Sequence, residues 1–255
     1  MFAAKAISVF LVLLFTSARL SAAAPTTLPA SPDPRFAVAE NLFTDDFDRG
    51  LLNWSSELES GGTVAAADAQ LAIDVPAGCT VWFKPMLSGP VMIEYEATAI
   101  SAGGANDRVS DLNCFWMARD SRSPNDIFGA KRSGKFSDYD ALRTYYVGQG
   151  GNRNTTTRFR RYIGESKNRP LLPEHDLRGS EDMLTPNVPQ TIRLIANGSI
   201  VQYYRDGKRV FDFQDPQPYT SGWFALRTTK NHMTVRQFRV YRLTPVPATQ
   251  PSQKP

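Results

Sequence analysis

The sequence predicts an all-β protein, folded as a two-sheet antiparallel β-sandwich of the jelly-roll kind. Apolar and polar residues alternate along many short segments, and long amphipathic helical patterns are hard to find. Gly, Pro, Asn and Asp residues bound these segments at the spacing typical of sandwiches. The dipeptides Asn-Gly in "ANGS" and Asp-Gly in "RDGK" also supply the positive φ angles that type I′ hairpin turns require.

Each expected strand is a run rich in β-branched or aromatic residues that stops at a turn residue. In chain order the runs cover residues 41–47, 70–75, 80–85, 91–100, 112–119, 141–149, 155–163, 190–197, 199–206, 208–215, 222–229 and 234–243. The two turn dipeptides join the strands between Gln190 and Phe213 into a meander. We expect the first and last strands to lie side by side and to close the sandwich.

The two ends of the chain differ in composition from the middle. Residues 1–24 have the features of a signal peptide, with Lys5 before the apolar run "AISVFLVLLF" and small residues in "ARLSAAAP". The apolar run is shorter than the roughly 20 residues of a membrane span. A proline-rich linker at 25–40 and a linker-like tail at 244–255 flank the predicted domain at 41–243. We therefore expect a secreted or periplasmic protein with no membrane span.

The charge is informative in its placement rather than in its total. The formal net charge is +4, and Lys5 and Arg19 of the signal peptide contribute to it. Such a balance does not predict nucleic-acid binding, which favours strongly basic domains. One stretch concentrates the cations Arg153, Arg158, Arg160, Arg161, Lys167 and Arg169, with Glu165 as its only anion. It predicts an anion-facing surface, with an ordinary solvated strand face as the alternative.

The strand at 155–163, "TTTRFRRYI", carries most of this charge. Because side chains alternate, Thr156, Arg158, Arg160 and Tyr162 share one face. That face has no aliphatic side chain to bury. It is therefore either the solvent side of a convex sheet or the floor of a concave groove.

The preceding strand at 141–149 adds tyrosines whichever way it faces. Thr144 and Tyr146 lie on one side, and Arg143, Tyr145 and Gln149 lie on the other. If "GGNRN" joins the two strands as a hairpin, tyrosine and arginine become cross-strand neighbours. Ordinary half-buried strand positions are the alternative for these tyrosines.

Arginine and tyrosine together on a groove floor would suit an acidic sugar. Arg158 and Arg160 could hold a uronate carboxylate through parallel hydrogen bonds, helped by the amide of Asn113 or Asn154. β-Elimination beside that carboxylate needs a base for the C5 proton and an acid for the leaving oxygen. The candidates for these two roles are Tyr146, Tyr162 and His175.

Histidine is scarce, so both positions matter. His175 lies in "RPLLPEHDLRG" between Glu174 and Asp176, which could raise its pKa or orient its ring. A hydrogen bond that orders the loop, or plain exposure, is the alternative. His232, in the turn before the last strand, is a second candidate.

Several other side chains have both a binding and a structural interpretation. Trp116 could stack on a sugar ring, although Leu112 and Cys114 at alternate positions favour the core. Arg143 is a substrate-binding candidate if its side of the strand lines the groove. Cys79 and Cys114 either pair, as exported cysteines can, or act as small buried hydrophobes.

Carboxylates could serve a metal site or hydrolysis. Asp107, Asp111, Asp120 and Asp126 could ligate calcium, but their spacing matches no calcium loop, so no cofactor is expected. A glycoside hydrolase needs two carboxylates across the scissile bond. Candidate pairs are Glu94 with Glu96, Asp138 with Asp140, and Glu174 with Asp176. The Glu-x-Asp-x-Glu pattern of jelly-roll glucanases is absent.

Two resemblances extend this interpretation. The opening Asp-Asp-Phe, the Gly-to-Trp step and the closing Phe-Arg-Val-Tyr are similar to lectin-like, concanavalin-type jelly rolls of extracellular carbohydrate-active proteins. The segments "GGANDRVSDLNCFWMARDSRSPNDIF", "SGKFSDYDALRTYYVGQGGNRNTTTRFRRYIG", "RPLLPEHDL", "YYRDG" and "GWFALRTTKNHMTVRQFRVYRL" resemble an uncharacterised family of exported bacterial domains. That family is associated with polysaccharide degradation, and the resemblance implies no particular catalytic residues.

These observations predict an exported carbohydrate-active protein that acts on an acidic, uronate-containing polysaccharide. The favoured activity is that of a polysaccharide lyase. A non-catalytic carbohydrate-binding module and a glycoside hydrolase are the alternatives.

Overall fold

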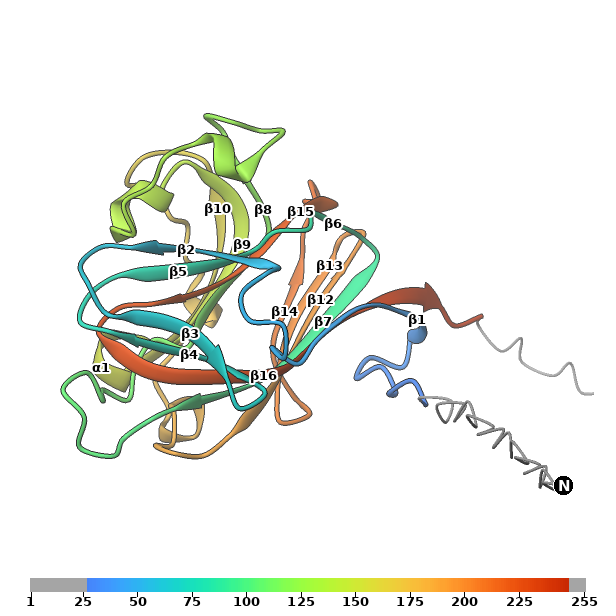
Figure 1. The fold of residues 1–255 in the computed structure, drawn as a ribbon. Helices are drawn as coiled ribbons and strands as arrows, with labels where there is room; N and C mark the ends of the chain where they lie inside the picture. The colour runs from blue at the N-terminus through green and yellow to red at the C-terminus, as the bar shows by residue number, and fades with distance from the viewer. Residues whose placement is uncertain (1–26, 248–255) are drawn as a thin grey trace, which may run out of the picture.

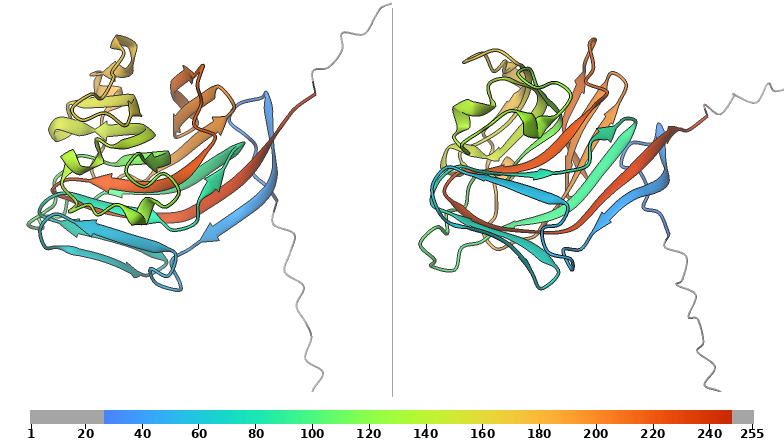
Figure 2. Two further views of the ribbon diagram at one scale, coloured as in Figure 1. Left: turned by 90° about the horizontal axis from the view of Figure 1, so that it is seen from above. Right: turned by 45° about the horizontal axis from the view of Figure 1, so that its top comes forward.

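The computed structural model describes residues 27–247, which form two antiparallel β-sheets packed face to face (Figures 1 and 2). Sheet A has the strand order β14-β13-β12-β7-β16-β4-β3, with β1 also paired to β16. Its strands are β1 (Phe36–Asp45), β3 (Thr63–Ala67), β4 (Gln70–Val75), β7 (Val91–Ala99), β12 (Gln190–Asn197), β13 (Ile200–Arg205), β14 (Lys208–Gln214) and β16 (Asn231–Pro245). The predicted fold class, a two-sheet antiparallel sandwich, is confirmed.

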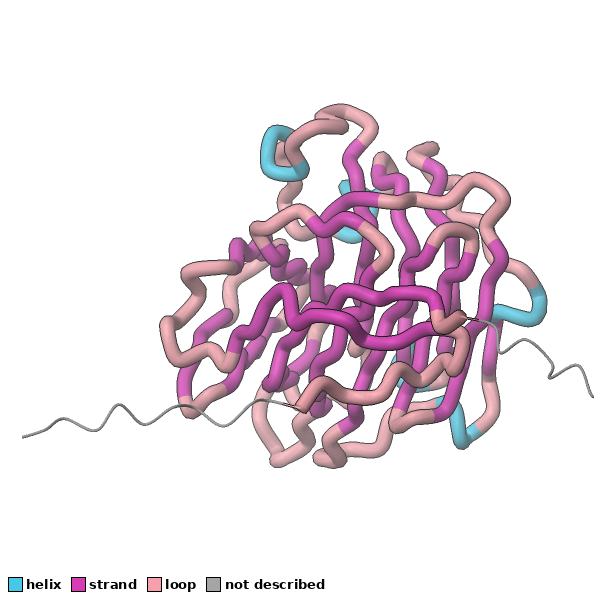
Figure 3. The backbone as a smooth tube through the Cα atoms, turned by 90° about the vertical axis from the view of Figure 1, so that its right-hand side faces the viewer, coloured by secondary structure: helices cyan, strands magenta, loops and turns pink. Residues whose placement is uncertain are grey.

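Sheet B has the strand order β11-β10-β9-β8-β15-β5-β2, with β6 also paired to β15. Its strands are β2 (Trp54–Leu58), β5 (Cys79–Phe83), β6 (Leu87–Ser88), β8 (Asn113–Asp120), β9 (Leu142–Gly150), β10 (Thr156–Ile163), β11 (Asp176–Leu177) and β15 (Ser221–Thr228). The helical turns are short, and strands make up most of the described chain (Figure 3). None of the helices within 27–247 is long and apolar enough to cross a membrane.

The predicted meander is present as β12, β13 and β14, but its two turns differ. Asp206 and Gly207 both have positive φ, 50° and 78°, as a type I′ turn requires. In the first turn Asn197 still pairs with Ile200, and Gly198, with φ 55°, is the first residue between them. A positive φ at that position alone corresponds to type II′, so the type I′ prediction is wrong there.

The first and last strands close the sandwich as expected, because β1 pairs along its length with β16. The predicted linker ends too late, since β1 already begins at Phe36. The prolines just before Phe36 made the whole segment resemble a linker, so the strand pattern that starts there was not recognised. At the other end, β16 continues to Pro245, beyond the predicted boundary at 243. The predicted signal peptide, the first residues of the linker and residues 248–255 lie outside the described residues.

Three apolar clusters hold the fold together, and two of them lie against sheet B. The largest one fills the space between the sheets and includes Trp54, Phe83, Trp116, Phe159 and Phe238. The second lies on the outer face of sheet B, where residues 121–140, lime green at the top of Figure 1, cover Trp82, Phe115 and Trp223. This 121–140 segment carries the short turns η1 (Ile127–Gly129) and η2 (Phe136–Tyr139). The 121–140 segment leaves part of the outer face over β8, β9 and β10 uncovered.

Candidate functional site

The open part of the outer face of sheet B is a groove of about 690 Å³, called here the basic groove. Strands β8, β9 and β10 form its floor, and neighbouring loops form its walls. Its lining residues are Arg108, Asp111, Asn113, Phe136, Tyr146, Gly148, Gly151, Asn152, Arg153, Thr156, Arg158, Arg160, Tyr162, Lys167, Arg169 and Thr229. The polar face of the strand at 155–163 therefore points into the groove.

The floor is set by the register of β9 and β10, which form the predicted hairpin. Arg160 pairs with Tyr146, and Arg158 pairs with Gly148. A Cβ at Gly148 would lie 2.8 Å from the Tyr146 hydroxyl, so glycine at this position makes room for the Tyr146 side chain. Tyrosine and arginine are thus cross-strand neighbours, as the sequence predicted.

A left-handed turn, α1 (Gly151–Asn154), forms one rim of the groove. Asn152, Arg153 and Asn154 all have positive φ, between 53° and 61°, which is uncommon for residues other than glycine. The Asn154 amide holds the turn in place: its Nδ2 donates to the Leu184 carbonyl at 2.9 Å, and its Oδ1 accepts from the Leu184 amide at 2.8 Å. Asn154 is therefore a residue that positions the rim, and it does not line the groove.

Six cations and one carboxylate line the groove. Three of the cations are paired: Arg158 with Asp176 at 2.7 Å, Arg169 with Asp140, and Arg108 with Asp111 at 3.3 Å. Within residues 27–247, the other three, Arg153, Arg160 and Lys167, form no ion pair. Arg160 is half-buried, and its guanidinium donates to the Arg169 carbonyl. Burial lowers the pKa of its guanidinium, because the buried charge has lost solvation and gained no counter-ion.

Two tyrosine rings lie on the floor with their centroids 5.4 Å apart. Burial raises the pKa of Tyr146 well above its usual value. Burial also raises the pKa of Tyr162, to about 12, although the nearby Arg169 and Arg160 oppose this shift. Both phenols are therefore protonated at neutral pH. The Tyr162 hydroxyl is buried and has no hydrogen-bond partner in the described chain.

The far end of the groove is built around Asp111. Its Oδ2 accepts hydrogen bonds from Ser110, from Thr229 at 2.7 Å and from Arg108 at 3.3 Å. Its Oδ1 accepts from the Asn113 Nδ2 at 3.3 Å. Asn113 is 2 % exposed, and its Oδ1 has no partner within the described residues.

Comparison of the sequence with models of protein families identifies the family. Residues 73–238 match the model of DUF6250, a domain of unknown function. The chain belongs to the DUF6250 family. The match covers more than half of the chain, and it includes all the lining residues of the basic groove. The comparison with curated proteins gave no match.

Solved structures similar to this DUF6250 protein share its fold at low sequence identity. A Bacillus subtilis protein of unknown function with a galectin-like fold aligns with a TM-score of 0.65 and 16 % identity, over 83 % of this chain and 100 % of that one. The carbohydrate-binding module CBM66 from Bacillus subtilis gives 0.51 and 11 %, over 75 % and 96 %. β-Agarase A from Zobellia galactanivorans gives 0.51 and 15 %, over 87 % and 98 %. The fold is concanavalin A-like, or galectin-like.

His175 does not reach the groove of this DUF6250 domain. It ends the turn η3 (Pro173–His175), and its ring packs edge-on against Phe159, Phe211 and Phe213, with centroids 4.9 to 5.9 Å apart. Burial lowers the pKa of the imidazole, while Glu174 opposes that shift only in part. The expectation of a raised pKa is therefore wrong, because the ring lies among core aromatics.

Two further candidates also lie away from the groove. Trp116 is fully buried between the sheets, where it packs against Tyr145 and Phe159. Arg143 points from the other side of β9, with its guanidinium 5.6 Å from the ring centroid of Tyr219. There it lines a separate, smaller cavity of about 200 Å³. Neither position suits contact with a ligand in the basic groove.

The candidate carboxylate pairs do not face the groove. Glu94 and Glu96 lie on sheet A, where they pair with Arg193 and Arg236. Asp138 accepts from the Ser133 amide at 2.8 Å. Asp111 is the one carboxylate among the lining residues, so a pair of carboxylates across a bound sugar is absent from the described part of the groove.

The four aspartates considered for calcium serve other partners. Asp107 accepts from the Ala102 and Gly104 amides and contacts His232 at 2.9 Å, and Asp120 binds two arginines. Asp126 caps η1. In residues 27–247, no cluster of three or more His, Cys, Asp and Glu is placed to hold a metal ion. Cys79 and Cys114 are both free and buried.

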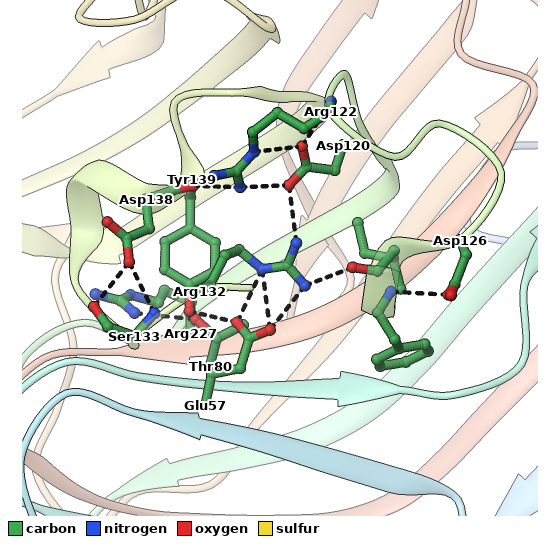
Figure 4. Close-up of polar contacts among 12 residues, drawn as sticks. Glu57, Thr80, Asp120, Arg122, Asp126, Arg132, Ser133, Asp138, Tyr139 and Arg227 are labelled. Carbon is green, nitrogen blue, oxygen red and sulfur yellow. Dashed lines mark hydrogen bonds and ion pairs between the residues drawn. The ribbon is translucent and has the colours of Figure 1, made fainter. Parts of the chain in front are cut away.

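A buried polar network fastens the 121–140 segment, which forms one wall of the groove (Figure 4). The Arg132 side chain is 0 % exposed, and its guanidinium donates to Glu57 at 2.7 Å and to Asp120 at 2.9 Å. Tyr139 donates its hydroxyl to the other Glu57 oxygen at 2.7 Å. The network therefore joins this segment to β2 and β8.

Sequence reasoning missed Phe136, Gly148 and Thr229 as lining residues. Lys167 and Arg169 were visible in the run of cations, but only the strand residues of that run were assigned to a groove. Arg169 lies over the Phe136 ring, 4.2 Å from its centroid. The cations in the loop after β10 could therefore have predicted that this loop forms the second wall of the groove.

Proposed function

We propose that this DUF6250 protein binds an acidic, uronate-containing polysaccharide in the basic groove. The observation that carries this proposal is the lining charge: three cations that form no ion pair within residues 27–247, Arg153, Arg160 and Lys167, face a groove whose described lining has one carboxylate. A planar guanidinium engages a carboxylate through two parallel hydrogen bonds. Phe136, partly buried, borders the groove and can contact the apolar side of a sugar.

The fold supports the ligand class. CBM66, a carbohydrate-binding module, and β-agarase A have the same sandwich architecture. Because such similarity concerns the fold, the groove chemistry remains the basis for the acidic sugar. We also infer export, from the apolar leader at 1–24, and an extracellular polysaccharide fits that location.

Binding ranks above catalysis because of the groove's titratable groups. Tyr146 and Tyr162 are protonated at neutral pH, so they can donate a proton but are poorly suited to remove one. His175 lies among core aromatics. A lyase needs a general base, whereas a non-catalytic binding module needs none. The binding module therefore accounts better for the residues that line the groove.

The test is retention and calorimetry with the purified protein. Oligogalacturonate and glucuronate-containing xylan should bind, and added salt should weaken binding because it screens the lining charges. Neutral glucan is the control and should not bind. If no uronate polymer binds at low salt, the proposal is wrong.

A polysaccharide lyase is the second candidate, favoured by the Tyr162 hydroxyl near Arg160, which has no partner among the described residues. In such a reaction a base removes the C5 proton, the electron pair forms the C4–C5 double bond, and the C4–oxygen bond breaks. The leaving oxygen takes a proton from a tyrosine, while an arginine stabilises the carboxylate charge. Rising ultraviolet absorbance from the unsaturated product would favour the lyase. A flat trace with a polymer that binds would favour the binding module.

A further inference from the structure

We propose that the cavity of about 200 Å³ beside Arg143, called here the Arg119–Arg143 cavity, binds a small oxyanion, either a carboxylate or a sulfate. Arg143 points from the side of β9 opposite to Tyr146, so this cavity and the basic groove lie on different sides of the strand. Its volume is below the roughly 300–1,000 Å³ of pockets for larger ligands, so the ligand must be small. The inference does not rest on the proposed function.

A β-bulge in β8 brings the two arginines to the same side of sheet B. Trp116 lies opposite Tyr145, and Arg119, three residues on, lies opposite Arg143, which is only two residues away on β9. In a regular strand Trp116 and Arg119 would face opposite sides, because side chains alternate. The extra residue in β8 instead directs Arg119 to the side on which Arg143 lies, and both line the cavity.

The backbone of this bulge is strained. Met117 has a φ of 53°, in the left-handed region that residues other than glycine seldom adopt. Gly222 on the neighbouring strand β15 makes room for the bulge, because a Cβ there would collide with the Met117 backbone. Strained residues of this kind cluster at functional sites. Met117 lines the Arg119–Arg143 cavity, so the strain lies at its wall.

The two arginines are like charges directly opposite each other, an arrangement that destabilises a sheet. Within residues 27–247 neither Arg119 nor Arg143 forms an ion pair. None of the described residues that line the cavity carries a carboxylate. An oxyanion between the two guanidinium groups would supply the counter-charge and turn the repulsion into attraction.

The two guanidinium groups have different roles. Arg119 is held in place: its Nε donates to the Ser221 carbonyl at 3.1 Å, its Nη2 to the Ser221 hydroxyl at 2.7 Å, and its Nη1 to the Pro124 carbonyl at 2.9 Å. Arg143 lies beside the Tyr219 ring, and its side chain forms no hydrogen bond with the described part of the chain. Its parallel N–H groups can therefore bind an oxyanion, while Arg119 adds a fixed positive charge.

The experiment titrates isotope-labelled protein with galacturonate, sulfate or galactose, with chloride keeping the ionic strength constant, and follows backbone amide signals by NMR. We expect the signals of Tyr219, Thr220 and Ser221 to shift in a saturable way with an oxyanion and not with galactose. The anion that binds more tightly shows whether a planar carboxylate or a tetrahedral sulfate is the preferred source. If these signals respond to neither anion, the proposal is wrong. Shifts of the Gly148 signal alone would also contradict it and would leave the proposed function intact.

Arg143→Gln tests the role of the free guanidinium. The side chain is exposed, and we expect the variant to bind the preferred anion about tenfold less tightly at the Tyr219 to Ser221 signals. The response of Gly148 to galacturonate should not change, because the basic groove lies across the sheet. Arg49→Gln, at another exposed arginine without an ion pair in residues 27–247, is the matched control and should bind like wild type. Wild-type affinity in Arg143→Gln would overturn the proposal, and the wild-type titration decides it if that variant does not fold.

Discussion

Arg160 on β10 lies directly opposite Tyr146 on β9, on the open face of sheet B. The pairing brings a half-buried guanidinium, which has no counter-ion in the part of the chain that the structure describes, beside a protonated phenol. Two residues along the same strands, Arg158 lies opposite Gly148, which has no side chain. The floor thus places an arginine beside a tyrosine whose ring is accommodated by the neighbouring glycine.

Gly148→Val should disturb the floor of the groove. A Cβ at Gly148 would lie 2.8 Å from the Tyr146 hydroxyl, so valine must displace the buried Tyr146 ring. The φ of Gly148 is not positive, so the backbone tolerates valine there. We expect at least a tenfold loss of affinity for uronate oligosaccharides, measured by calorimetry, and a lower melting temperature than wild type because Tyr146 must repack. Undiminished binding would show that the ligand lies elsewhere.

His175 should make stability depend on pH. Its pKa is lowered in the folded protein, so the unfolded chain takes up a proton first as the pH falls through about 6.5. The wild type should therefore lose stability from pH 7 to pH 5, by at most about 1.4 kcal/mol per pH unit from this residue. Urea unfolding of His175→Phe should show a smaller loss over the same range. A steeper loss in the variant would contradict the burial of a neutral imidazole.

The outcome for His175 shows where sequence reasoning stops. Alternation along one strand correctly placed Arg158, Arg160 and Tyr162 on a common face, because a period of two is a local property. The aromatic surroundings of His175 come from Phe159 and from two phenylalanines more than 30 residues farther along. No local pattern reports such a long-range contact, so the flanking carboxylates suggested an exposed loop.

Fold prediction had a similar limit. The strands with aromatic and β-branched alternation were found, and so was the closure of the sandwich by β1 and β16. The strands β2 and β3 were missed because "WSSEL" and "TVAAA" are polar or small. The cover of the 121–140 segment over Trp82 and Phe115 was also missed. It explains why β5 is buried on both faces.

Both cysteines should behave as buried thiols. Cys79 and Cys114 are free and fully buried, and burial raises the pKa of each to about 12. We expect no reaction with an aromatic disulfide reagent at pH 8 in the native protein, and two reactive thiols per chain in urea. Absence of thiols in the unfolded protein would show that the two cysteines pair and would contradict the structure.

The wall of the groove should depend on Arg132. Its fully buried guanidinium binds Glu57 on β2, Asp120 on β8 and the Ile127 carbonyl at 2.8 Å. Arg132→Met leaves Glu57 without an arginine, while Asp120 keeps Arg122, and breaking a buried pair of this kind typically costs about 3 kcal/mol or more of unfolding free energy. Urea unfolding measures that cost, and hydrogen exchange should accelerate within the segment.

A matched control separates burial from charge pairing. Arg236→Met removes an arginine whose side chain is half exposed beside Glu96 on sheet A, and surface pairs of this kind contribute about 1 kcal/mol or less. If Arg132→Met costs no more than Arg236→Met, the buried network does not fasten the segment. If it costs several times more and also weakens uronate binding, the network supports Phe136 at the groove wall. Loss of stability with unchanged binding would confine the role of Arg132 to the fold.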